Sequence, residues 1–504
     1  MPTLTEILSG APLAHESRPW PRHLVDRDLW RDLARQLGDG LWTLAGLWGE
    51  VGMVHIALLD AAAREIAIAT LPCADERFPS VGALHAPAIR LERTLHDMFG
   101  LEAVDAPDPR PWLDHGRWPV RAPLGARTPA PDVAPAYAFL TAEGQGLQQI
   151  PVGPVHAGII EPGHFRFHAG GETVVRLEER LGYVHKGVEG LMTGASLDRA
   201  AQLAARTSGD STVAYSIAFA RAVESALGVE IPPRAHWLRA LMAELERLAN
   251  HFGDIGAICN DASFALMHAH TGALRERVLR VAQACFGHRL MMDVVAPGGT
   301  GADLTPAGEG LVRALLATIR GAFPGLIVLY DNTASLQDRT VGAGRLHAQL
   351  ARQFGCGGFV GRASGRDFDA RRDFAYPPYD QLRFETPVLS EGDVNARVWI
   401  RIREVEQSLD LIEQILGGMP GGPARAALAG VGAPREGVAL VEGFRGDVLA
   451  WVRLDADGAV ARCHLRDPSW FQWPVLEAAI EGNIVADFPL CNKSFNCSYS
   501  GHDL

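Results

Sequence analysis

The chain has 504 residues, of which 47% are hydrophobic and 21% are charged, and its formal net charge is -12 at pH 7. This length exceeds what one hydrophobic core usually organises, and the composition excludes extended disorder and low-complexity repeats. A nucleic-acid surface needs clustered lysine and arginine, so the acidic balance argues against such a partner. The longest apolar runs, such as residues 326–329, fall far short of the ~20 residues that span a bilayer. We therefore expect a cytoplasmic chain with no direct membrane span.

The first predicted elements form a small α/β domain over residues 1–120. Residues 43–71 predict strands around a turn, because the apolar runs 51–59 and 65–71 flank the segment 60–64. A helix should follow over 91–100, where apolar side chains recur at helical spacing and Gly100 suits a left-handed stop.

A proline-rich stretch marks the end of this domain. Eight of the 32 prolines lie between Pro107 and Pro135, which removes backbone donors and favours extended conformations. We place a linker at residues 121–150 and a second domain at 151–504.

The second domain is predicted to be mainly helical. Near its end, Pro474 could occupy the first position of a short helix that runs to Glu481 and stops at Gly482, followed by an irregular tail. Taken together, the elements predict an α+β fold. Two apolar stripes at helical spacing predict long helices. The first stripe comprises Leu238, Leu241, Leu245, Leu248 and Phe252, and the second comprises Ile402, Val405, Leu409, Ile412 and Leu416.

Seven cysteines occur without any Cys-x-x-Cys pair. The odd count does not suit a disulfide framework, and an iron–sulfur cluster normally takes four cysteines, often closely spaced. We expect no cluster in this chain and interpret Cys491 and Cys497 as buried core thiols. The glycine pairs at 342–344 and 417–432 lack the strand–GxGxxG–helix context of a dinucleotide site.

The second domain opens with Gly153-Pro-Val-His156-Ala-Gly and Leu181-Gly-Tyr-Val-His185-Lys-Gly-Val-Glu189. These motifs resemble the large subunit of group 4 energy-converting nickel-iron hydrogenases, of the hydrogenase-3/4 and formate-hydrogenlyase type, and its relative, the quinone-site large subunit of complex I. The segment 91–100 with its following prolines is similar to the smaller complex I subunit that is fused to it in formate-hydrogenlyase-type proteins. The resemblance implies a hydrogenase-like second domain with a β-hairpin region near its start, and a place among NAD-binding, quinone-linked oxidoreductase complexes of the NADH-quinone oxidoreductase C/D type. Further matching segments are 244–251, 337–345, 362–365, 445–447 and 482–487.

The nickel-binding motifs of that family are mostly lost. Arg206-Thr-Ser208-Gly-Asp-Ser211 has the spacing of Arg-x-Cys-Gly-x-Cys, and Cys497-Ser-Tyr-Ser500 that of Cys-x-x-Cys. Three of the four thiols are serine hydroxyls, which are neutral near pH 7 and too hard to replace thiolates at a nickel or iron site. We expect no metal in this degenerate metal pocket, whose residues are Arg206, Ser208, Ser211, Cys497 and Ser500.

Three residues are candidates for the remaining chemistry. His156 matches the complex I histidine that hydrogen-bonds a quinone headgroup, and the alternative is that it only closes a tight loop. Glu189 matches the hydrogenase glutamate that relays protons, which a buried carboxylate with a raised pKa could do. Its alternative is an ion pair with Arg180 or Lys186. Asp210 could form a hydrogen-bonded network with Arg206, Ser208 and Ser211, or hold a hard cation.

The resemblance implies a subunit that couples redox chemistry to ion translocation without hydrogen activity. We expect an iron–sulfur small subunit as electron donor, a quinone as candidate acceptor, and antiporter-like and anchor subunits in the membrane. The chain would lie on the inner face of the cell membrane through these partners. Two alternatives are a non-catalytic structural subunit and an active nickel-iron hydrogenase.

Overall fold

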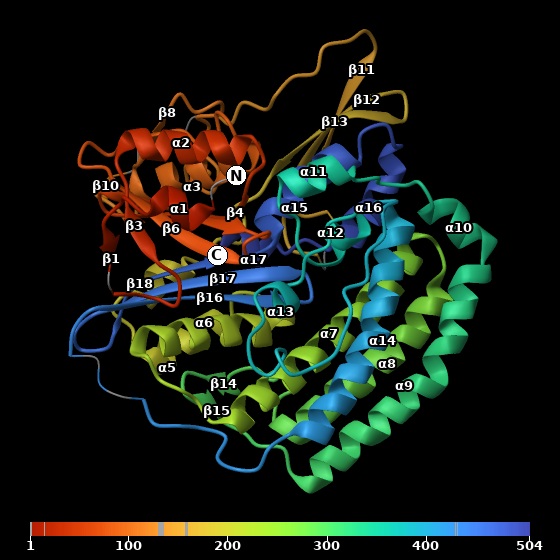
Figure 1. Ribbon diagram of the computed structural model, residues 1–504. Helices are drawn as coiled ribbons and strands as arrows, with labels where there is room; N and C mark the ends of the chain where they lie inside the picture. Colours follow the sequence, from red (N-terminus) through yellow and green to blue (C-terminus); the bar gives the residue numbers. More distant parts are fainter. Residues whose placement is uncertain (1–2, 15, 130–135, 157–159, 429, 431) are drawn as a thin grey trace.

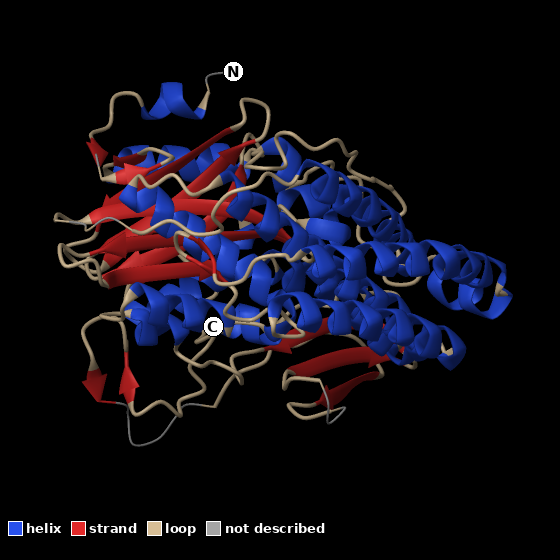
Figure 2. Cartoon of the chain, turned by 90° about the horizontal axis from the view of Figure 1, so that it is seen from below, coloured by secondary structure: helices blue, strands red, loops and turns tan. Residues whose placement is uncertain are grey.

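The computed structural model describes residues 3–14, 16–129, 136–156, 160–428, 430 and 432–504 (Figure 1). Strands gather at one end of the molecule and long helices at the other (Figure 2). This arrangement confirms the predicted α+β fold, with a small α/β part preceding a mainly helical one.

The N-terminal sheet has five strands in the order β1-β3-β6-β5-β4. The predicted pair of strands is confirmed as the antiparallel β5 and β6. The predicted helix is confirmed as α3 (Ile89–Phe99), and Gly100 ends it at a φ of 76° in the left-handed region. The strands are β1 (Leu13–Ala14), β3 (Arg22–Leu24), β4 (Thr43–Glu50), β5 (Met53–Asp60) and β6 (Glu65–Pro72).

A second sheet has the order β18-β17-β16-β2. Its main strands form an antiparallel meander of β16 (Arg435–Gly443), β17 (Gly446–Leu454) and β18 (Val460–Arg466). The short β2 (Ser17–Arg18) pairs parallel with β16. The N-terminal part of the chain therefore supplies an edge strand to the sheet of the C-terminal part.

The two sheets pack face to face around a shared core. Trp48 of β4 and Trp451 of β17 lie with ring centroids 5.7 Å apart, and Leu440 and Leu449 belong to the same buried cluster. Helix α6 (Thr212–Leu227) covers the other face of the second sheet, while α2 (Arg27–Gly38) and α3 lie over the N-terminal sheet (Figure 1). The domain limits at residues 120 and 150 stay predictions, but the parts they separate share buried apolar surface.

Four long helices build the other end of the molecule. All five residues of the first predicted stripe are fully buried in α7, and the second stripe is buried in α14. The apolar periodicity therefore predicted both helices correctly. The four helices are α7 (Pro233–Asp261), α8 (Ala265–Phe286), α9 (Pro306–Asn332) and α14 (Val394–Gly418).

Helix α9 is, among the described residues, the one helix long and apolar enough to cross a membrane by length and composition alone. It packs against α8 and α14, and its buried residues include Val312, Ile319 and Phe323. Much of its second half is exposed, with Val328 59% accessible.

A three-stranded antiparallel sheet projects from the body and contains the predicted hairpin region (Figure 1). Its strands are β11 (Leu147–Val152), β12 (His164–Gly170) and β13 (Thr173–Arg180). The loop between β11 and β12 carries His156.

The predicted C-terminal elements need two corrections. Helix α15 spans Ser469–Ala479, so Pro474 lies inside it and does not begin it. The helix starts earlier because Asp467 accepts a hydrogen bond from the Ser469 N–H at 2.8 Å. The tail is also not irregular, since it forms α16 (Phe488–Phe495) and α17 (Tyr499–Asp503), which bury Phe488, Phe495 and Tyr499.

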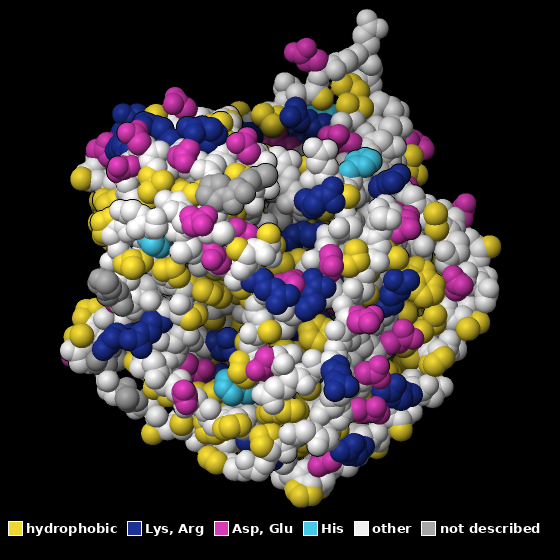
Figure 3. Space-filling view, in the orientation of Figure 1, with side chains coloured by type: hydrophobic (Ala, Val, Ile, Leu, Met, Phe, Trp, Pro, Cys, Tyr) yellow, Lys and Arg dark blue, Asp and Glu magenta, His cyan; other side chains and the backbone are white. Residues whose placement is uncertain are grey.

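On the face drawn in Figure 3, basic and acidic side chains are interspersed.

The remaining elements are short. These elements are α1 (Leu4–Leu8), β7 (Arg77–Pro79), β8 (Glu102–Val104), β9 (Val120–Arg121), β10 (Thr128–Pro129), α4 (Val188–Met192), α5 (Leu197–Ala205), β14 (Val295–Ala296), β15 (Gly299–Thr300), α10 (Ala334–Thr340), α11 (Ala348–Gln353), α12 (Gly358–Ala363), α13 (Ala370–Asp373) and the 3-10 turns η1 (Ala86–Ala88), η2 (Gly209–Ser211) and η3 (Val485–Asp487).

Candidate functional site

Two serines of the degenerate metal pocket, Ser208 and Ser211, lie just before and in η2, ahead of α6, and the third, Ser500, lies in α17. The Ser208 hydroxyl donates to Asp210 Oδ1 at 2.6 Å, and the Ser211 hydroxyl donates to the same oxygen at 3.3 Å. The predicted network between Asp210 and these two serines is therefore present.

The cation of this network is Arg445, and the prediction of Arg206 was wrong. Arg445, in the turn between β16 and β17, donates to both Asp210 oxygens at 2.8 and 2.6 Å. Arg206 follows the end of α5 on the surface, where it pairs with Asp293 at 2.6 Å. The sequence carried a signal for Arg445, because it belongs to one of the family-like segments.

The Asp210 carboxylate is ionised. Burial raises its pKa, but the Arg445 guanidinium outweighs burial, and with the serine hydroxyls it holds the pKa at about 2. The side chain of Asp210 is 35% exposed, whereas that of Arg445 is 5% exposed. The ion pair is therefore buried on the Arg445 side and partly open to solvent on the Asp210 side.

The C-terminal residues complete the pocket in an unexpected way. Ser498, at an intervening position of the Cys497-Ser-Tyr-Ser500 motif, places its hydroxyl 3.2 Å from that of Ser208. The Ser500 backbone N–H donates a hydrogen bond to Glu161 at 3.1 Å. The Cys497 thiol is buried, and burial raises its pKa well above the usual range.

This donor set does not fit a nickel-iron centre. Such a site depends on thiolates, and the pocket offers hydroxyls, one protonated thiol and a carboxylate already neutralised by Arg445. Among the described residues, no three His, Cys, Asp or Glu side chains are grouped as a metal site would require.

His156 lies in the β11–β12 loop, next to residues 157–159, which lie outside the described structure. Its ring meets Phe165 edge to face at 5.5 Å. Aromatic rings continue from Phe165 to Trp473 at 6.3 Å and from Trp473 to Tyr499 at 4.8 Å, two residues from Cys497. Burial, and then the charge of Lys493, lower the pKa of His156, so the imidazole is neutral.

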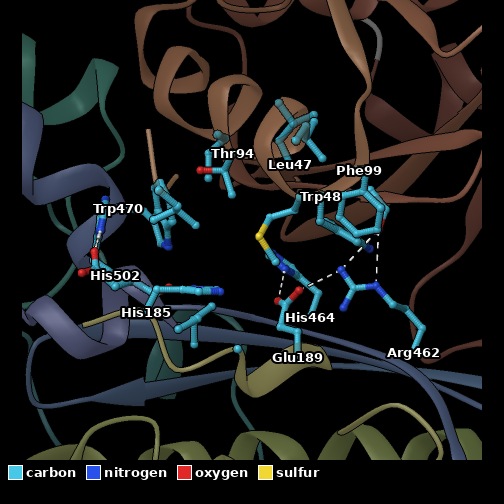
Figure 4. Close-up of a pocket in the computed structure, with 18 residues that line it drawn as sticks. Leu47, Trp48, Thr94, Phe99, His185, Glu189, Arg462, His464, Trp470 and His502 are labelled. Atoms are coloured by element: carbon cyan, nitrogen blue, oxygen red, sulfur yellow. Dashed lines mark hydrogen bonds and ion pairs between the residues drawn. The ribbon is translucent and has the colours of Figure 1, made fainter. Parts of the chain in front are cut away.

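Glu189 differs from its prediction in both pKa and partners. Its carboxylate accepts from His464 Nδ1 and pairs with Arg462, each at 2.8 Å (Figure 4). Burial raises its pKa, but Arg462 and His464 hold the value at about 2. The expected raised pKa is therefore wrong, as are the suggested partners.

Arg180 and Lys186 are both engaged elsewhere by backbone carbonyls. Arg180 donates to the carbonyls of Trp112 and Asp114, and Lys186 donates to that of Thr207 at 2.6 Å. Since β18 is far from α4 in the sequence, spacing alone could not identify Arg462 and His464 as the partners of Glu189.

A small cavity of about 50 Å³ lies beside Glu189, between the N-terminal part and the second sheet (Figure 4). Trp48 and Phe99 line it from the N-terminal side, and His464 stacks on Trp48 with centroids 5.1 Å apart. His464 Nε2 is buried and has no hydrogen-bond partner among the described residues. The Glu189 site therefore faces the contact between the two parts of the chain.

Sequence reasoning also missed a chain of buried ion pairs between α7 and α14. Glu404 accepts from His251 at 2.8 Å and pairs with Arg362 at 2.7 Å. Arg362 also pairs with Glu442 at 2.9 Å. The signal was the spacing of charged residues on the buried faces of both helices, namely Glu244, Arg247, His251 and Asp254 on α7 and Arg397, Arg401 and Glu404 on α14.

Comparison with family models matches both parts of the chain. Residues 262–436 match the respiratory-chain NADH dehydrogenase 49 Kd subunit, and residues 25–132 match the 30 Kd subunit of the same enzyme.

Individual relatives extend these matches over most of the chain. Formate hydrogenlyase subunit 5 of Escherichia coli is 32% identical over 436 residues, which cover 84% of this chain and 77% of that protein. The C/D protein of NADH-quinone oxidoreductase from Phocaeicola vulgatus is 28% identical over 447 residues, covering 83% of this chain and 86% of that protein. A chain in the structure of the membrane-bound sulfane sulfur reductase, an archaeal respiratory membrane complex, superimposes with a TM-score of 0.67 at 27% identity, covering 72% of this chain and 100% of that one.

Proposed function

Because the chain belongs to the family of group 4 hydrogenase large subunits and fused C/D-type NADH-quinone oxidoreductase subunits, we propose that it is the large subunit of a membrane-associated electron-transfer complex. The relatives and the structural neighbour named above are subunits of hydrogenase or respiratory complexes. The scaffold that relates them spans nearly all of this chain. Its role would be to couple redox chemistry to ion translocation in partner subunits.

The observation that carries the proposal is the ion pair of Asp210 with Arg445 in the pocket where the family binds nickel. Asp210 joins two of the serines that replace thiolates, and Arg445 neutralises it at 2.6 Å. A stable polar network in place of the metal supports a function without hydrogen activity.

A quinone is the proposed electron acceptor, with His156 as the residue that contacts its headgroup. A neutral imidazole can donate one hydrogen bond, and His156 lies beside the aromatic rings of Phe165 and Trp473. An iron–sulfur partner subunit would supply the electrons.

We further propose that the chain sits on the cytoplasmic side of the membrane, held by antiporter-like and anchor subunits. Support comes from the membrane complexes of the relatives and from the exposed apolar second half of α9, where Val328 is 59% accessible. An apolar surface of this kind is typical of contacts between subunits.

A non-catalytic structural subunit is the second candidate. The ion-paired state of Glu189 favours it, because a carboxylate with a pKa of about 2 does not take up protons near neutral pH. The two candidate functions differ in whether the assembled complex catalyses electron transfer to a quinone.

The test is a purified complex assayed for nickel by elemental analysis and for electron transfer to a short-chain quinone analogue. The proposal expects no stoichiometric nickel and a quinone-dependent turnover that falls in His156→Ala. An assembled complex without quinone-dependent turnover would support the structural subunit, and about one nickel per chain would overturn the proposal.

A further inference from the structure

The contact between the N-terminal part and the hydrogenase-like part contains a cluster that neither the family match nor the proposed function explains. Glu179 of β13 and Glu477 of α15 share the guanidinium of Arg90, which reaches them from α3. Arg90 Nη1 lies 3.1 Å from Glu179 Oε2, and Arg90 Nη2 lies 2.6 Å from Glu477 Oε1. The Glu179 backbone N–H also donates to Glu477 Oε1 at 2.7 Å.

The cluster has two carboxylates and one cation in a buried place. Glu179 is completely buried, and its Oε1 atom has no hydrogen-bond partner among the described residues. The Glu477 side chain is 23% exposed, and that of Arg90 is 10% exposed. Arg90 also stacks over the Trp112 ring at 4.5 Å, which holds it in the cluster.

Among the described residues, Arg90 is the one cation that contacts either carboxylate. Arg93 and Arg180 also lie over the Trp112 ring, but Arg93 pairs with Asp108 and Arg180 donates to backbone carbonyls. Glu178, the neighbour on β13, pairs with Arg110 at 2.7 Å. The thiols of Cys491 and Cys497 and the phenol of Tyr499 have pKa values raised by burial, so they are uncharged. His502, which lies near Arg90, has a pKa lowered by burial and is neutral, and the nearby Tyr137 has a raised pKa and is uncharged.

We propose that Glu179 and Glu477 form a proton-binding pair, in which two carboxylates hold one proton because the single guanidinium of Arg90 neutralises only one of them. Two like charges at this separation disfavour each other, so one site stays protonated. Glu477 keeps the ionised form, since its Oε1 accepts from both Arg90 and the Glu179 backbone. Burial, together with the charge of Glu477, raises the pKa of Glu179 well above its usual range, which agrees with this assignment.

The pair lies close to the segment that carries Cys497 and Ser500. Helix α15, which carries Glu477, packs against α17 through Trp473 and Tyr499, whose ring centroids are 4.8 Å apart. The pair itself is independent of the proposed function, because it can be measured on the chain without any electron transfer.

The test compares thermal unfolding of the full chain and its Glu179→Gln variant between about pH 5 and about pH 8. Glutamine resembles the protonated acid. A raised pKa in the folded state makes wild type lose stability as pH rises from the unfolded value toward the folded one. The variant should therefore match wild type near pH 5 and melt several degrees higher near pH 8. A difference in melting temperature that does not change with pH would overturn the proposal.

The matched control is Glu178→Gln, which removes a buried carboxylate from a neighbouring cluster in which Arg93 and Arg110 balance Asp108 and Glu178. It should lower the melting temperature at both pH values. Infrared spectra then separate a pair from a single buried acid. Other buried acids such as Glu246 also contribute to the carboxylic-acid carbonyl band, so each variant is compared with wild type as a difference spectrum. The band should lose the same component in Glu179→Gln and in Glu477→Gln, because the remaining carboxylate then has Arg90 alone. An unchanged band in Glu477→Gln would overturn the shared proton, and this variant decides the question even if Glu179→Gln does not fold.

Discussion

Glu179 and Glu189 lie ten positions apart on either side of one loop, and both are buried. Glu189 is ionised, whereas we propose that Glu179 is protonated. Glu189 has Arg462 and His464 to itself, and its pKa is about 2. Glu179 shares Arg90 with Glu477, and its pKa is raised well above the usual range. Burial raises the pKa of both carboxyl groups. The number of cations per carboxylate therefore decides the charge state, and the degree of burial does not.

The largest effect on stability should come from removing the shared cation. Arg90→Met leaves Glu179 and Glu477 without positive charge, and losing one partner of a buried charged cluster costs roughly 3–5 kcal/mol. Urea unfolding near neutral pH would measure the loss. Arg90→Lys, which keeps the charge, should lose less.

A double variant sharpens this comparison. Adding Glu179→Gln to Arg90→Met removes one of the two carboxyl groups left without a cation, so it should recover more stability than Glu179→Gln gains in the wild-type background. Strict additivity of the two changes would show that Arg90 and Glu179 do not interact.

The next largest effect should come from Glu189→Gln. Arg462 and His464 lose their ionised partner, and we expect a cost of about 2–3 kcal/mol near neutral pH, at the lower end for a buried pair. Because the folded pKa is depressed to about 2 from 4.5, this stability is present above pH 4.5 and is lost as the pH falls through about 2. Unfolding measured across the acid range would check the sign: a deficit of the variant that grows toward acid would contradict the ionised state of Glu189.

Asp210 is an intermediate case, with one guanidinium and partial exposure. Asp210→Asn should cost about 1–2 kcal/mol, below the value for a fully buried pair, because solvent screens a side chain that is 35% exposed. Its contribution is likewise present above pH 3.8 and lost as the pH falls through about 2. Ser211→Ala is a suitable comparison, since its 3.3 Å hydrogen bond is the weaker one. A larger loss in Ser211→Ala than in Asp210→Asn would contradict the central place of Asp210.

The sequence predicted local elements well and partners poorly. Apolar periodicity identified α3, α7 and α14 because each helix buries one face along its whole length. The pairing of Asp210 with Ser208 and Ser211 was also accessible, since all three lie within four residues. Arg462 and His464 were not, because each reaches Glu189 from β18, more than two hundred residues away. Arg445 was indicated by its family-like segment, but its pairing with Asp210 across a similar distance was not. Only the packing of the second sheet against α4 and η2 brings these charges together.

His156 should show the smallest effect on stability. It extends the comparison to a titratable group that forms no ion pair among the described residues. It lies in a loop and meets Phe165 at 5.5 Å, so His156→Ala should change the unfolding free energy by no more than about 0.5 kcal/mol. Quinone-dependent turnover of the assembled complex should nevertheless fall, because alanine cannot donate a hydrogen bond to a headgroup.

Lys493→Gln offers a sharper control, since the charge of Lys493 helps to lower the pKa of His156. Its removal should shift the pH profile of turnover to higher pH without abolishing activity. Unchanged turnover in His156→Ala would leave this residue with the role of closing its loop.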